Sequence, residues 1–253
     1  MNLKLNLYAS QVRKTSADDY YENFYRSVMT KGIIGIFVGL YHKHLEFKFD
    51  ENTNFDRVLE VGAGNCEHIY YVRHKFLEYV ATDIRIEPLI SEVSKMLGQT
   101  VNPDIAYRIP NSNRSILVSE VNAQDLSRFP DKSFDRVIAG CLILHLEVPE
   151  LALQEWRRVT KNGGQISIYV HSEPGVLLRF ARAISTSLRG RRLGINHIHH
   201  VYREHKIHFL AIKNLVDDVF EDDKVKFNAF PVPKLSWNFS LWKVVQIKKS
   251  QKR

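Results

Sequence analysis

The chain has 253 residues, of which 44% are apolar and 25% charged, and its formal net charge is +8. This composition is typical of a soluble globular protein with one large domain, or one domain with an inserted cap. Two cysteines, Cys66 and Cys141, are too few for a disulfide framework and favour a reducing compartment such as the cytoplasm. The first ten residues lack the apolar core of a secretory signal, and the apolar run 32–41 is too short to span a bilayer. The positive charge favours acidic partners, although it fits an inert basic surface equally well.

Helical, aromatic-rich sequence precedes residue 55, and short β-rich runs alternate with helical patterns after it. The predicted strands are 55–61, 78–83, 115–121, 133–140, 165–171, 224–232 and 236–247. The predicted helices are 65–77 with Asn65 as its N-cap, 85–97, 148–160 ended by the glycines of 161–164, and 204–220.

This alternation predicts an α/β fold with a doubly wound, mostly parallel sheet of seven strands. The last two strands have no helix between them, so they should form an antiparallel hairpin at the sheet edge. We expect residues 1–54 to form an N-terminal helical cap and residues 55–171 the ligand-binding core. Residues 172–203 should form an insertion after the fifth strand, and 204–253 the last helix and the hairpin.

A glycine turn follows the first predicted strand, in the sequence LEVGAGN. Gly62 and Gly64 allow positive φ angles and close approach of a ligand, but the third glycine of the dinucleotide fingerprint is replaced by Glu67. Glu60 would repel a pyrophosphate and suits a cationic group, unless it forms an internal salt bridge. Asp83 ends the second strand, where a carboxylate can accept both hydroxyls of a ribose or cap the next helix. A ribose, a positive charge and no phosphate together describe S-adenosylmethionine.

At these residues the chain resembles the class I methyltransferases that use this cofactor. LEVGAGN resembles their glycine motif, VATDI their ribose-binding strand end, and residues 121–146 their adenine-binding turn and fourth strand. The resemblance covers roughly residues 55–171 and implies the fold, the methyl donor and a set of contacts. The implied cofactor-binding residues are Glu60, Gly62, Ala63, Gly64, Asp83, Ile84, Asn122, Ala123, Gly140 and Cys141. Asn122 stands where the family usually has an acid, and both cysteines also suit small buried positions.

Histidines dominate the region where the methyl group should emerge. His145 follows the fourth strand and is a candidate general base or a packing residue. His205 and His208 are expected on one face of the helix 204–220, with Glu204, as an acceptor-binding or catalytic cluster. Their order differs from a zinc-binding H-E-x-x-H motif, so no metal site is predicted.

The insertion after the fifth strand is basic, with no Asp or Glu from Pro174 to Arg203. It combines an apolar helical stripe, from Val176 to Leu188, with arginines on another face. Its arginines are Arg179, Arg182, Arg189, Arg191, Arg192 and Arg203, and Gly190 is expected to end the helix. Arginines over the acceptor site would suit a phosphate-bearing or nucleotide-linked acceptor, or they form a solvated charged face.

The leading functional hypothesis is methyl transfer to a small, polar, anionic acceptor in capsule or surface-glycan assembly, by resemblance of the EH..H stretch to bacterial enzymes of those pathways. A second hypothesis is methylation of a lipid headgroup, with the basic amphipathic helix in peripheral contact with an anionic membrane. A third is an RNA-binding protein that keeps the cofactor fold, but no aromatic stacking motif accompanies the basic residues, so no nucleic-acid partner is expected.

Overall fold

The computed structural model describes residues 32–188 and 197–251, and the side chains of His199 and His200 are left out. Its strands are β1 (Asn54–Val61), β2 (Lys75–Asp83), β3 (Ala106–Arg108), β4 (Ser115–Glu120), β5 (Phe134–Ala139), β6 (Thr160–His171), β7 (Lys224–Phe230) and β8 (Trp242–Lys248). Its α-helices are α2 (Gly32–Glu46), α3 (Ile86–Leu97), α4 (Pro149–Val159), α5 (Val176–Ile184), α7 (His197–Glu204) and α8 (Phe209–Val219). Short 3-10 helices are η2 (Glu67–Tyr71), η3 (Ile143–His145) and η4 (Trp237–Phe239).

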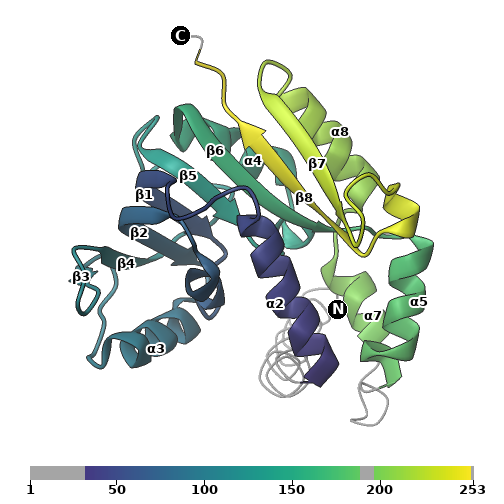
Figure 1. The fold of residues 1–253 in the computed structure, drawn as a ribbon, viewed down its shortest axis with the longest axis horizontal. Coiled ribbons are helices and arrows are strands. Elements are labelled where there is room, and N and C mark those ends of the chain that lie inside the picture. The colour runs from purple at the N-terminus through teal and green to yellow at the C-terminus, as the bar shows by residue number, and fades with distance from the viewer. Residues whose placement is uncertain (1–31, 189–196, 252–253) are drawn as a thin grey trace, which may run out of the picture.

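The strands form one sheet of eight strands in the order β3-β4-β2-β1-β5-β6-β8-β7 (Figure 1). The five central strands, β4, β2, β1, β5 and β6, are parallel. β7 and β8 form the predicted antiparallel hairpin, with β8 inserted between β6 and β7. The predicted α/β class and the mostly parallel sheet are confirmed. The expected strand count of seven is one too low, because the short edge strand β3 pairs antiparallel with β4.

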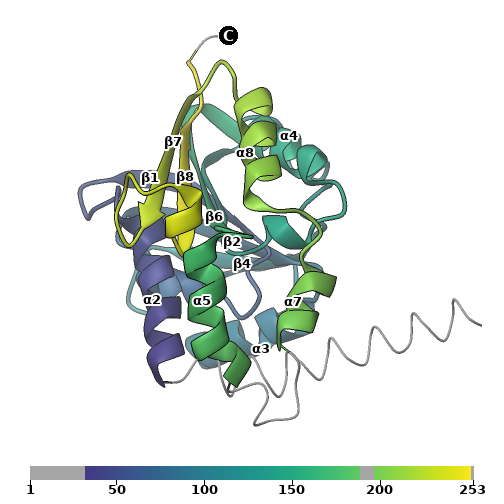
Figure 2. The same ribbon diagram turned by 90° about the vertical axis from the view of Figure 1, so that its right-hand side faces the viewer.

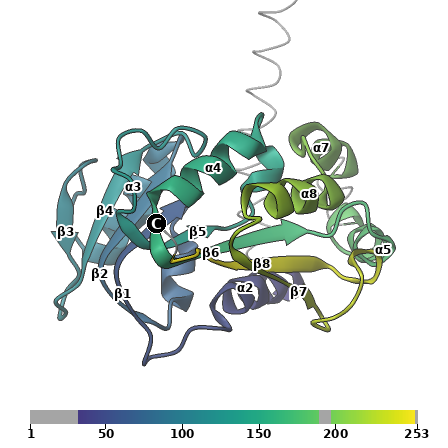
Figure 3. The same ribbon diagram turned by 90° about the horizontal axis from the view of Figure 1, so that it is seen from above.

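Helices cover both faces of the sheet and create two apolar cores. α4 and α8 pack on one face, where Trp156 and Ile212 are fully buried. α2 and α3 pack on the other, where Leu45 and Leu89 are fully buried. Figure 3 shows α4 and α8 on one side of the strands and α2 on the opposite side. Alternating side chains of each central strand therefore enter different cores.

The connection between β1 and β2 differs most from the sequence prediction. The helix expected over 65–77 is wrong: this stretch forms only the five-residue η2, and Lys75 already begins β2. Asn65 caps nothing, because the residue before η2 is Cys66 in a left-handed conformation. α2 contacts η2 and supplies the helix of this layer instead. α2 places a helix at 32–46 before the first strand, residues 47–53 form turns, and residues 1–31 of the predicted cap lie outside the described residues.

Two helix boundaries also differ. α4 ends at Val159 without a glycine cap, because residues 161–164 already belong to β6 and only Gly163, at φ 77°, keeps a turn-like conformation. The helix expected over 204–220 is two helices, α7 and α8, joined by residues 205–208. α5 ends at Ile184, so the stop expected at Gly190 lies outside the described part of the chain.

Candidate active site at the carboxyl edge of the sheet

The glycine turn lies where β1 ends, beside the carboxyl ends of its neighbours β2 and β5. Gly62 and Gly64 have φ angles of 65° and 55°, which a side chain would strain. A Cβ atom on Gly62 would also lie 2.8 Å from the Leu142 side chain, whereas a Cβ on Gly64 would meet no atom within 4 Å. Gly62 therefore makes the turn pack against the loop after β5, and Gly64 leaves open space in front of the turn.

Asp83 fixes this turn from the end of β2. Its carboxylate accepts hydrogen bonds from the amide of Gly64 at 2.9 Å and from the amide of Arg85 at 2.8 Å. The backbone continues the link, since Ala63 N donates to Thr82 O and Val121 N to Asp83 O. Each carboxylate oxygen has further lone pairs, so Asp83 can bind ribose hydroxyls while it holds the turn.

Glu60 faces the protein interior, and the sequence interpretation that it meets a cationic ligand at the turn is not supported. It lies on β1 in phase with Val58, so its side chain points into the α2 and α3 core, where it is only 3% exposed. The Tyr79 hydroxyl donates to its carboxylate at 2.7 Å. Burial raises the pKa of Glu60, while nearby His68 lowers it.

The remaining predicted cofactor residues gather at the same edge. Ile84 follows Asp83 and is 65% exposed, so it offers an apolar surface to a ring. Asn122 is exposed, and its Oδ1 accepts from Gln124 N at 3.0 Å, whereas Ala123 is buried and its carbonyl accepts from Trp156 Nε1. A Cβ atom on Gly140 would meet nothing within 4 Å. Whether they contact the cofactor stays a prediction.

Three histidines meet beside β5 and β6. The rings of His145 on η3 and His205 are 4.8 Å apart, edge to face, and His171 at the end of β6 stacks on His205 at 5.9 Å. Lys206 N donates to Leu144 O at 2.7 Å and ties the 205–208 linker to η3. The structure thus brings together two of the predicted catalytic residues, His145 and His205.

Glu173 organises this cluster and was missed by the sequence prediction. Its Oε2 lies 2.6 Å from His205 Nδ1, and its Oε1 pairs with Arg182. Burial opposes ionisation of Glu173, but the His205 hydrogen bond and the Arg182 charge outweigh it and lower its pKa to about 2. A permanent carboxylate at Nδ1 keeps the proton of a neutral His205 ring on that nitrogen, leaving Nε2 as a proton acceptor.

His171 was also missed, and it stays uncharged. Burial, with the nearby Arg182 charge, lowers the pKa of His171 well below its usual value. Its two nitrogens lie 3.1 Å from the Tyr169 hydroxyl and 3.5 Å from the Cys141 sulfur. Cys141 is a free thiol whose pKa burial raises to about 12, so it is not a nucleophile. The sequence signal for His171 and Glu173 is their place just past a parallel strand.

The other two predicted catalytic residues, His208 and Glu204, do not belong to this cluster. His205 and His208 do not share a helical face, because both lie in the linker, and His208 is the exposed N-cap of α8, accepting from Ala211 N at 3.5 Å. The carboxylate beside His205 belongs to Glu173 and not to Glu204.

Arg182 is paired with Glu173 and Arg179 is exposed, while Arg189, Arg191 and Arg192 lie outside the described residues. Within residues 32–188 and 197–251, no three His, Cys, Asp or Glu side chains are placed to hold a metal ion.

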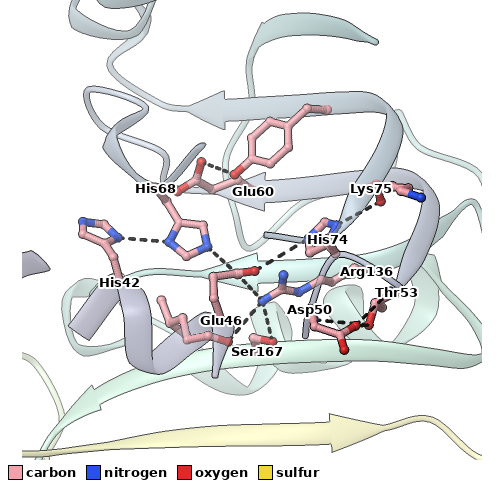
Figure 4. A network of polar contacts seen from close by, with 12 residues as sticks. His42, Glu46, Asp50, Thr53, Glu60, His68, His74, Lys75, Arg136 and Ser167 are labelled. Atoms are coloured by element: carbon pink, nitrogen blue, oxygen red, sulfur yellow. Dashed lines mark hydrogen bonds and ion pairs between the residues drawn. The ribbon is translucent and has the colours of Figure 1, made fainter. Parts of the chain in front are cut away.

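A buried polar network supports the site from the α2 side (Figure 4). Glu46 on α2 pairs with Arg136 on β5 at 2.6 Å and with His68 on η2 at 2.9 Å, and all three side chains are at most 1% exposed. His42 continues the chain, 3.0 Å from His68, and His74 lies 3.9 Å from Glu46. Burial lowers the pKa of His42 to about 2 and that of His74 to about 4, so both are neutral. His68 lies on η2, which follows the glycine turn directly. The network therefore holds the turn on its α2 side.

Comparison with known proteins agrees with this geometry. Residues 59–168 match the sequence profile of a methyltransferase domain. S-adenosylmethionine is the methyl donor of this class of domain, and the matched segment contains the glycine turn, Asp83 and His145.

One curated relative is a phosphatidylethanolamine N-methyltransferase of Cereibacter sphaeroides, 28% identical over 120 residues. The match covers 47% of this chain and 53% of the relative, so the chain spans about half the length of that protein. Among solved structures, the YcgJ protein of Bacillus subtilis has a TM-score of 0.53 at 17% identity, covering 84% of this chain and 100% of that one. A possible histamine N-methyltransferase from Thermotoga maritima has a TM-score of 0.54 at 15% identity, covering 85% and 90%. These structural matches establish a shared fold.

Proposed function

We propose that the protein transfers a methyl group from S-adenosylmethionine to a hydroxyl or amine acceptor at the carboxyl edge of its sheet. The observation that carries this proposal is the link between Asp83 and Gly64, which sets a ribose-binding carboxylate beside an open glycine turn. A dinucleotide fits the turn less well. Its pyrophosphate needs the N-terminus of an α-helix, and here the turn leads into the five-residue η2.

The histidine cluster supplies the second half of the reaction. When bound, the cofactor offers a sulfonium methyl group. An acceptor lone pair would bond to that methyl carbon, and the electron pair of the broken carbon–sulfur bond would remain on sulfur. The proton of the acceptor must leave, and we assign its removal to His205 Nε2, with Glu173 holding Nδ1. His145 and His171 then form the polar wall beside this base.

The first candidate acceptor is a small anionic molecule of capsule or surface-glycan assembly, a hypothesis based on the arginines of the insertion after β6. The pairing of Arg182 with Glu173 removes one of the arginines on which that hypothesis rested. A lipid headgroup amine is the second candidate. It is supported by the name of the phosphatidylethanolamine N-methyltransferase relative and by apolar side chains exposed on α5, which begins three residues after Glu173.

Cofactor binding tests the proposal directly. We expect titration calorimetry to show binding of S-adenosylhomocysteine and no binding of NAD. Asp83→Asn should weaken S-adenosylhomocysteine by about 1.5–3 kcal/mol, the scale of hydrogen bonds to a charged group. Asp56→Asn is the matched control, because Asp56 is an exposed carboxylate near the amino end of β1, away from the glycine turn. The dissociation constant of this variant for S-adenosylhomocysteine should stay at the wild-type value. Binding of NAD, or unchanged affinity in a folded Asp83→Asn variant, would contradict the proposal.

A further inference from the structure

Three helices present apolar side chains to solvent on the side where the insertion leaves the sheet. On α5 only Leu178 is buried, while Phe180 and Ile184, four residues apart, are 62% and 59% exposed. On α2, Ile33 and Ile36 are 60% and 63% exposed. Monomeric proteins expose single apolar residues everywhere, but such side chains gathered on neighbouring helices mark a contact surface.

The arrangement of the helices brings these side chains to one end of the molecule. α2, α5 and α7 extend in the same direction beyond the sheet, and their free ends lie at one level (Figures 1 and 2). The residues at those ends are Ile33 near the start of α2, Ile184 at the end of α5 and Ile198 near the start of α7. Leu188, just after α5, is 48% exposed. We call Ile33, Ile36, Phe180, Ile184, Leu188 and Ile198 the apolar tip.

The exposed charged side chains of these three helices have one sign, and Lys43 and Arg203 lie in the last turns of α2 and α7, on the sheet side of the apolar tip. The exposed charged side chains on α2, α5 and α7 are Lys43, Arg179 and Arg203, all basic. Of the two acids on these helices, Glu46 is fully buried in the network of Figure 4, and Glu204 is partly buried at the end of α7. Apolar side chains that enter a bilayer, with basic side chains behind them at the level of the headgroups, are typical of binding to an anionic lipid surface. None of the described helices is long and apolar enough to cross a bilayer.

We propose that the apolar tip docks the protein on an anionic membrane, with Ile33, Ile36, Phe180, Ile184, Leu188 and Ile198 entering the headgroup layer. Docking does not depend on the proposed methyl transfer. The two helices connect the apolar tip to the histidine cluster, because α5 begins three residues after Glu173 and α7 ends one residue before His205.

Vesicle sedimentation of the full chain tests this proposal. We expect the protein to sediment with vesicles of phosphatidylcholine and phosphatidylglycerol, and much less with phosphatidylcholine alone. Raising the salt from 0.1 to 0.5 M should reduce binding, because the electrostatic part is screened. Phe180→Asp with Ile184→Asp should lower the partition coefficient at least about tenfold. Leu151→Asp changes a 49% exposed side chain on α4, which packs on the opposite face of the sheet from α2, and this variant should bind like the wild type.

Other occupants of the surface give different results. If a second copy covers the apolar tip, sedimentation velocity shows a dimer that the double variant dissociates, and vesicles bind neither protein. If another segment of the chain covers it, the double variant melts several degrees lower and again vesicles bind neither. Either result overturns membrane docking, as does equal vesicle binding by wild type and double variant.

A second pair on another helix, Ile33→Ser with Ile36→Ser, should reproduce the loss. Calorimetry with S-adenosylhomocysteine on the same variants should be unchanged, which separates this proposal from the proposed function.

Discussion

His205 is the residue on which the proposed proton transfer depends. We expect His205→Ala to lower turnover by about two to four orders of magnitude, the usual contribution of a general base. Affinity for S-adenosylhomocysteine should stay within about 0.5 kcal/mol, the range for a residue that the ligand does not contact. Activity of the variant should recover at high pH, where the acceptor loses its proton without help. The measurement is the pH profile of methyl transfer to an acceptor found by screening hydroxyl and amine compounds.

Two neighbouring residues sharpen the test of His205. Glu173→Gln should also slow turnover, because an amide can present its NH₂ to Nδ1 and stabilise the wrong tautomer. His208→Ala is the matched histidine control, since His208 caps α8 in the exposed end of the linker, and its turnover should be close to wild type. Full turnover in both His205→Ala and Glu173→Gln would remove the base from this cluster.

Among the elements, α2 depends most on one buried contact. Glu46→Ala leaves the fully buried Arg136 guanidinium without its carboxylate and removes a partner of His68. We expect this variant to lose about 3–5 kcal/mol of unfolding free energy, as for other broken buried ion pairs. The measurement is chemical denaturation at pH 7.

The exposed pair of Glu92 and Lys95 on α3 provides the comparison for Glu46→Ala. Both side chains are partly in water, so Glu92→Ala should cost less than about 1 kcal/mol. Similar losses in the two variants would show that the network of Figure 4 contributes little to holding α2.

Element prediction succeeded where local pattern and tertiary packing agree. The strands β1, β4 and β5 and the helix α3 were predicted within one residue or so, because their apolar periodicity matches the core that they enter. The stretch 65–77 failed because Ile69, Val72 and Phe76 fit a helix, while Lys75, Phe76 and Leu77 also alternate as a strand. Local sequence cannot decide between helix and strand for this stretch. The outcome depends on α2, from earlier in the chain, which already covers this face of the sheet.

In the candidate site, too, some residues could be predicted from local sequence and others could not. The turn and Asp83 follow from short motifs, so sequence was sufficient to find them. Glu60 was placed by its distance from the turn, but strand alternation sends its side chain into the opposite core. Glu173 escaped because its role comes from His205, 32 residues later, and the pattern around it reads as an ordinary loop.

For the whole molecule, three neutral buried histidines, His42, His74 and His171, predict acid sensitivity. The folded-state pKa of His42 is about 2 and that of His74 about 4, both below the unfolded value near 6.5. Below pH 6.5 the unfolded chain binds protons that the folded chain excludes, so stability is greatest above that pH and falls as the pH drops. Each histidine should cost on the order of 1.4 kcal/mol per pH unit between pH 6.5 and its folded pKa.

Thermal unfolding between pH 7.5 and 4.5 measures this effect. The melting temperature should stay nearly constant from pH 7.5 to 6.5 and fall below pH 6.5, and the fall should be less steep in His42→Gln, which removes one of the three groups. A melting temperature that is flat down to pH 5 would mean that these rings are protonated in the folded protein.

The position of α2 in the chain also has a consequence for the order of events during synthesis. Leu45 accepts a hydrogen bond from Gln246 Nε2, a contact between residues 201 positions apart. At about 5–20 residues per second, a ribosome needs on the order of 10–40 s to make the chain between them. Throughout that time Leu45 and Glu46 have no completed sheet to pack on. The first described helix is therefore among the last to dock, and nascent chains stalled before β8 should leave it open to proteases and chaperones.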